Sequence, residues 1–175
     1  MFFKTAFIFS LAVSALALPA SSDSRRVKRA DVLKSQSYAD FQVSDGVAGN
    51  ALAEVNANFP IDATDLANVS DNDEDIINAA RKTAEAAETD AGGFNDAIDA
   101  AGGTKTAAGK ALQVGKIKNK VLKLQLEVLA LQIAQAKGGK DNSAKITQEQ
   151  TKLQNNIKLD TGAKGQASQS VDFKG

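Results

Sequence analysis

The strongest periodicity of the chain lies in residues 105–137, which read KTAAGKALQVGKIKNKVLKLQLEVLALQIAQAK. One apolar row recurs at alternating intervals of three and four residues: Val114, Ile117, Val121, Leu124, Val128 and Leu131. A second row lies on nearly the opposite helical face: Leu122, Leu126, Leu129 and Ile133. The spacing predicts a helix, and a helix that is apolar on two sides is typical of the central element of a bundle. We therefore expect a long helix with neighbours on both sides.

The sequence upstream predicts a first helix over residues 37–58. Its apolar row comprises Phe41, Ala48, Leu52, Val55 and Phe59. Gly46 and Gly49 either break this helix or allow a neighbouring backbone to approach closely. Pro60 ends it, because the residue before a proline disfavours helical backbone.

Residues 61–70 are expected to form a link or a single helical turn. A second helix starts at residue 71, where a run of acids precedes an alanine-rich row with helical spacing. Acidic side chains stabilise a helix N-terminus. A short helix carrying Phe94 and Ile98 follows, bounded by two Gly-Gly pairs.

After the central helix, Gly138-Gly139 turns the chain, and a last helix is predicted over residues 143–159. The sum is an all-α fold, an antiparallel bundle of about four helices in a domain of residues 30–160. Residues 161–175 are polar and contain glycine, so we expect them to be a flexible C-terminal tail.

The N-terminus has the pattern of a secretory precursor. An apolar run over residues 5–18 follows a short basic start and carries a small-x-small motif at residues 15–17. Residues 1–17 are therefore predicted to be a signal peptide. The alternative is a transmembrane anchor, but the run is shorter than the ~20 apolar residues that a bilayer core requires.

Residues 18–29 are predicted to be a pro-segment that ends in the dibasic pair Lys28–Arg29. Subtilisin-type processing proteases of the secretory route read such pairs through acidic pockets. The alternative interpretation is a solvated charge cluster or a basic patch for nucleic acid. Its position directly after a signal peptide favours processing, which leaves a mature chain of residues 30–175.

Charge is unevenly spread along the mature chain. Residues 30–99 hold 3 basic and 15 acidic groups, whereas residues 100–175 hold 13 basic and 5 acidic groups. Either the two halves lie against each other and partly neutralise, or a basic face meets an anionic partner. Because acids outnumber bases in the mature chain as a whole, no general attraction to nucleic acid is expected.

The residue inventory argues against catalysis. The chain has no histidine and no cysteine, which excludes Ser-His-Asp and Cys-His nucleophile systems and removes the commonest zinc ligands. Paired carboxylates could still act as in glycosidases, but some acidic pair is inevitable in so acidic a half. We expect no enzyme, no catalytic residue and no cofactor.

No metal site is expected either. Residues 71–75 (DNDED) open like a calcium loop, but Ile76 and Lys82 stand where such a loop needs glycine and glutamate. Acids that stabilise a helix N-terminus are the preferred interpretation.

Two further features bear on the surface. Asn68-Val69-Ser70 is a glycosylation acceptor, which puts Asn68 on a loop of a secreted chain; Ser70 could instead simply cap a helix. Four lysines of the central helix, Lys116, Lys118, Lys120 and Lys123, either snorkel along its edge or form an anion site.

Four stretches carry a resemblance to small secreted, cysteine-free helical proteins of filamentous ascomycete fungi. They are residues 37–51 (SYADFQVSDGVAGNA), 92–98 (GGFNDAI), 115–124 (GKIKNKVLKL) and 165–171 (GQASQSV). The resemblance covers most of the mature chain and implies secretion, with a Kex2-like protease cutting at Lys28–Arg29. It implies no activity, and no site residue is carried over from it.

The sequence thus favours a secreted, non-enzymatic interaction protein, effector-like or associated with the fungal surface or wall, whose partner is an extracellular protein or glycan. One alternative is a carrier that holds a small apolar ligand between its helices. Another is a helical protein that acts at membrane surfaces. No stable membrane anchor is expected, because polar side chains interrupt the central helix.

Overall fold

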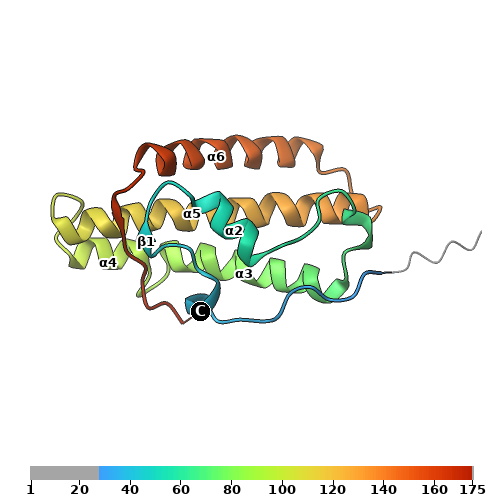
Figure 1. Cartoon of the computed structure of the whole chain (residues 1–175), viewed down its shortest axis with the longest axis horizontal. Helices are drawn as coiled ribbons and strands as arrows, with labels where there is room; N and C mark the ends of the chain where they lie inside the picture. The colour runs from blue at the N-terminus through green and yellow to red at the C-terminus, as the bar shows by residue number, and fades with distance from the viewer. Residues whose placement is uncertain (1–27, 175) are drawn as a thin grey trace, which may run out of the picture.

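Helix α5 (Ala107–Ala136) runs through the middle of the molecule, between α3 (Asp71–Thr89) and α6 (Ser143–Gly162) (Figure 1). The computed structural model describes residues 28–174. The predicted signal peptide (1–17) and the part of the pro-segment before Lys28 lie outside the described residues.

Both apolar rows of α5 are packed. Leu122, Leu126, Leu129 and Ile133 belong to the larger core cluster, together with the apolar face of α3. Val121, Leu124 and Val128 form a second cluster with Leu153 of α6 and Ala51. Each such side chain contributes roughly 1.5–3 kcal/mol when fully buried. The prediction of a central helix with neighbours on both sides is confirmed.

Helix α3 begins at the predicted residue. The Ser70 hydroxyl accepts a hydrogen bond from the backbone N–H of Asp73 at 3.0 Å and so caps the helix. Before it, the link contains one turn of 3-10 helix, η1 (Leu66–Asn68). The face of α3 that meets α5 is lined mainly by small residues: Ile77, Ala80, Ala84 and Ala87.

The remaining predicted helices are also present. Helix α4 (Phe94–Ala100) buries Phe94 and Ile98. Helix α6 starts after a turn in which the Asp141 carboxylate accepts bonds from the N–H and hydroxyl of Ser143, and it continues three residues beyond the predicted end. Asp71 at the start of α3 pairs with Lys137 just after α5, and Glu88 near the end of α3 pairs with Lys120 farther back along α5, so the two helices run antiparallel. The all-α bundle is confirmed.

The single helix expected over residues 37–58 is wrong. The structure has α1 (Tyr38–Phe41), an extended segment with β1 (Gly46–Val47), and α2 (Ala51–Asn58). Gly49 adopts a φ of +116°, and a Cβ there would lie 2.7 Å from Cγ of Lys164. The helix is therefore broken at these glycines, and Gly49 also admits a close neighbour, whereas a Cβ at Gly46 would meet nothing within 4 Å.

The flexible tail expected over residues 161–175 also needs correction. Strand β2 (Ala167–Ser168) pairs antiparallel with β1, with Gly46 opposite Ser168. The Gln169 N–H donates to the carbonyl of Ala111 at 3.0 Å, and Phe173 packs against the larger core cluster. The segment crosses α5 at Gly115, where a Cβ would lie only 2.0 Å from the Gln169 carbonyl oxygen.

Candidate functional site

A charged groove of about 300 Å³ opens between α3, α5 and α6. Seven charged side chains and one leucine line it: Arg81, Glu85, Lys123, Leu124, Glu127, Lys145, Glu149 and Lys152. Four of these charges are positive and three are negative. Three helices thus bring opposite charges to one surface hollow.

Glu127 is the central acid of this charged groove. Its side chain is 15% exposed, and its carboxylate lies 2.8 Å from Arg81 of α3 and 2.8 Å from Lys145 of α6. Arg81 also pairs more loosely with Glu85, at 3.8 Å. At the α6 side, Lys152 pairs with Glu149 at 2.9 Å. Lys145 and Lys152 remain about half exposed, so they are the cations most available to a ligand.

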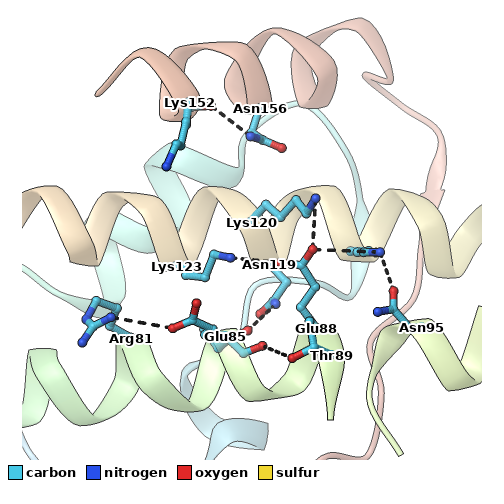
Figure 2. A network of polar contacts seen from close by, with 12 residues as sticks. Arg81, Glu85, Glu88, Thr89, Asn95, Asn119, Lys120, Lys123, Lys152 and Asn156 are labelled. Carbon is cyan, nitrogen blue, oxygen red and sulfur yellow. Dashed lines mark hydrogen bonds and ion pairs between the residues drawn. The ribbon is translucent and has the colours of Figure 1, made fainter. Parts of the chain in front are cut away.

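A second cluster of charges surrounds Glu88 and lies next to the groove (Figure 2). Its carboxylate lies 3.0 Å from Lys120, 3.1 Å from Lys123 and 4.0 Å from Lys116. Burial favours the neutral acid, but the bonds from Lys120 and Lys123 outweigh it and hold the pKa of Glu88 below its ordinary value. These three lysines therefore neutralise a buried acid of α3.

Lys118, the fourth lysine of that group, points elsewhere. It is fully buried, and its ammonium donates to the carbonyls of Asp45 and Val47 at 3.0 and 3.1 Å and pairs with Glu54 at 2.9 Å. All three ammonium donors are thereby satisfied. Three of the four lysines thus share the Glu88 carboxylate, and the fourth has partners of its own inside the fold.

Other buried polar groups also hold the fold together. Asn119 donates to the Ala84 carbonyl at 2.7 Å and accepts from the Tyr38 hydroxyl at 2.9 Å, which ties α1, α3 and α5 together. Burial raises the pKa of the Tyr38 phenol to about 12. Asp160 of α6 accepts from the N–H groups of Gly49 and Ala51 at 2.9 Å each and so fixes the start of α2.

A second hollow is apolar. It has about 310 Å³ and lies between the N-terminal strap, which we define as residues 28–37, and α3. Its lining includes Phe41, Phe59, Ile76, Ala79 and Ala80, with Lys34 and Asp75 among the polar residues. This hollow does not involve the second apolar row of α5, which is packed against α3.

Lys28 and Arg29, the predicted processing pair, are the first two residues that the structure describes. Arg29 lies against η1, and Lys28 pairs with Asp71 at the start of α3. Asn68 is half-buried in η1, where its amide donates to the Asp65 carboxylate at 2.8 Å. Ser70, the third residue of the acceptor motif, is buried and caps α3.

Acids among residues 71–75 are bonded to other groups of the fold. Asp71 and Glu74 both pair with the Lys137 ammonium, at 3.1 and 2.7 Å. The Asp73 carboxylate is buried and turns inward to accept from the N–H groups of Val32 and Leu33. Among residues 28–174, no group of three His, Cys, Asp or Glu side chains is placed to hold a metal ion. Within the same residues, no helix is long and apolar enough to cross a membrane.

Sequence reasoning missed the charged groove. The one available signal was Glu127, the single acid in the otherwise basic helix α5, directly between two core residues. An acid at such a place requires cationic neighbours, but the sequence does not say which helices supply them.

Fold and groove together define a small all-α bundle whose charged surface is assembled from three helices. The chain belongs to the family described as a domain of unknown function (DUF8454), whose model matches residues 33–172. The match extends beyond α6 through β2 to Asp172, so the packed C-terminal segment is part of the family's domain. No curated protein and no solved structure matches the chain.

Proposed function

We propose that this chain is a secreted, non-enzymatic interaction protein of a filamentous ascomycete, effector-like or associated with the cell surface or wall. Its contact surface is the charged groove, and its partner is an extracellular protein or glycan. The observation that carries the proposal is the convergence of seven charged side chains from three helices on one open hollow.

Two properties of the groove support recognition rather than chemistry. First, the groove acids are paired with cations, Glu127 with Arg81 and Lys145, and Glu149 with Lys152. Glu85, the third acid of the groove, pairs with Arg81 at 3.8 Å, so each of the three groove acids has a cationic partner. Second, the rim lysines are exposed enough to exchange their bonds for those of a polar ligand, with little change in the paired interior.

Affinity capture tests this proposal. Purified residues 30–175 are immobilised and exposed to host extracellular extract and to wall extract of the producing fungus, and specifically retained proteins or glycans are identified. The groove variant Lys145→Gln/Lys152→Gln removes the two exposed cations. The matched control Lys140→Gln/Lys158→Gln removes two lysines of the same helical hairpin that do not line the groove.

We expect the parent and the control to retain the same partner and the groove variant to retain at least about tenfold less, since loss of charge-assisted hydrogen bonds costs 1.5–3 kcal/mol each. Equal loss in the two variants would show that general charge, not the groove, makes the contact. Turnover of glycans, peptides or esters at enzyme-like rates would contradict the non-enzymatic class altogether.

The apolar hollow supports a second candidate function, the carriage of a small apolar ligand. Its volume of about 310 Å³ is at the lower end of ligand sites, and two phenylalanines contribute to its wall. Native mass spectrometry of the secreted protein tests it. A retained small molecule, lost on substitution of Ala79 by Leu, would support carriage; a bare protein mass would count against it.

A further inference from the structure

Arg29, the last residue of the predicted pro-segment, is bound to the folded domain by side chain and backbone. Its guanidinium donates to the carbonyl oxygens of Asp65 at 2.8 Å and Asp62 at 3.4 Å. The carboxylates of the same two residues lie 3.7 and 3.5 Å from the guanidinium. The backbone N–H of Arg29 donates to the Asn68 carbonyl at 2.9 Å.

The residues on either side of Arg29 are bound as well. Lys28 pairs with Asp71, which a second lysine of the domain also contacts. Downstream, the N–H groups of Val32 and Leu33 donate to the buried Asp73 carboxylate at 3.1 and 2.8 Å. The peptide bond between Arg29 and Ala30 is thus flanked by anchors on both sides, where the strap passes the start of α3 (Figure 1).

A subtilisin-type processing protease makes demands that conflict with this arrangement. It hydrolyses the Arg29–Ala30 bond with one water, leaving a carboxylate on Arg29 and an amine on Ala30. To do so it must draw the segment into its cleft and place both basic side chains in its own acidic pockets. In the folded chain those side chains already occupy acidic sites, and the Arg29 N–H is already bonded.

We propose that folding closes this site: docking of the strap withholds Lys28–Arg29 from the protease, so the chain is cut either before the strap docks or during local opening of the strap. Cleavage then removes the Lys28 and Arg29 anchors, and the strap of the mature chain is held mainly through Asp73. The proposal rests on the predicted processing site and is independent of the charged groove.

The experiment uses the precursor of residues 18–175 and a protease specific for dibasic pairs. Initial cleavage rates are compared for the folded precursor, for a peptide of residues 22–35, and for two variants. The first variant, Asp62→Asn/Asp65→Asn, weakens the contacts of Arg29 and leaves the cleaved sequence unchanged. The matched control, Asp96→Asn/Asp99→Asn, removes two acids of α4.

We expect the peptide to be cut on the order of 100-fold faster than the folded precursor, because cleavage must wait for a local opening. The Arg29-site variant should be cut about fivefold faster than the parent, as loss of two partly exposed ion pairs predicts, and the control at the parent rate. Matching thermal midpoints will show that the variants are folded.

Amide exchange provides a second readout that does not depend on the variants. The Val32 and Leu33 amides should be protected in the precursor, and their exchange should become severalfold faster after cleavage. A precursor cut as fast as the peptide, or unprotected Val32 and Leu33 amides in the uncut chain, would overturn the proposal. A peptide that the protease does not cut would overturn the processing premise and the proposal with it.

Discussion

Substitution of Gly115 by alanine tests the crossing of α5 by the C-terminal segment. In an open helix this change is stabilising by up to about 1 kcal/mol, because glycine is the poorer helix former. At Gly115 the new Cβ would stand 2.0 Å from the Gln169 carbonyl oxygen and 3.2 Å from a ring carbon of Phe94. The helix and the crossing segment therefore make opposite demands on this residue.

The change in the free energy of unfolding depends on whether the steric clash or the gain in helix propensity is larger. A Cβ–oxygen contact of 2.0 Å is far inside van der Waals distance, so the backbone at Gln169 must move away. Overpacking of this kind costs about 1–3 kcal/mol, and loss of the bond from Gln169 to the Ala111 carbonyl costs about 1 kcal/mol more. After the gain in helix propensity, we expect a net loss of about 1–3 kcal/mol.

Urea unfolding of residues 30–175 measures this loss, with amide exchange over residues 167–174 as the local readout. The matched control is Gly162→Ala at the end of α6, where a Cβ would meet nothing within 4 Å. The control should be neutral or slightly stabilising. If Gly115→Ala stabilised the protein as much as Gly162→Ala, with unchanged exchange of the C-terminal segment, the packed crossing would be refuted.

Three further predictions concern buried ionisable groups. Tyr38 is the only tyrosine, so phenolate absorbance should report its pKa of about 12 directly. Because the unfolded phenol ionises near 10, about 3 kcal/mol of stability should be lost between pH 10 and 12 in the parent and not in Tyr38→Phe. The pKa of Glu88 is lowered, so its stabilisation is present above its ordinary pKa of 4.5 and is lost as the pH falls below it; Glu88→Gln should flatten the acid side of the stability profile measured by urea unfolding. Replacing Lys118 by methionine should cost about 2–4 kcal/mol in the same assay, because Glu54 and two carbonyls lose their partner, and a loss below 0.5 kcal/mol would contradict its structural role.

Local sequence patterns were sufficient to predict the long helices. The two rows of α5 predicted both its length and its packed faces, because periodicity over many turns outweighs local propensity. Ser70 and the acids after it predicted the start of α3, since capping and helix-dipole effects act within one turn. The uneven charge was also informative, because basic α5 lies against acidic α3.

The two failures have one physical cause. Residues 42–50 and 163–170 each carry little local signal, and each is ordered by contact with the other and with α5. Phe41 and Phe59 fit one helical row, but their burial comes from the larger core cluster and not from a shared helix. Contacts between segments more than 100 residues apart leave no periodicity to detect.

The charged groove could not be predicted from the sequence, for a related reason. Arg81, Glu127 and Lys145 come from three helices, and their meeting depends on the register in which α3 and α6 pack on α5. A single sequence gives the faces of these helices but not that register. The sequence shows each acid and each lysine, but only the structure shows which of them form ion pairs.

The role of the groove is measured by the binding of the captured extracellular partner to three immobilised forms of residues 30–175: the parent, Lys145→Gln/Lys152→Gln and Lys140→Gln/Lys158→Gln. If the groove is the contact surface, the parent and the last form bind with equal affinity, and the groove variant binds at least about tenfold more weakly. Equal affinity for all three forms would contradict the groove as the contact surface.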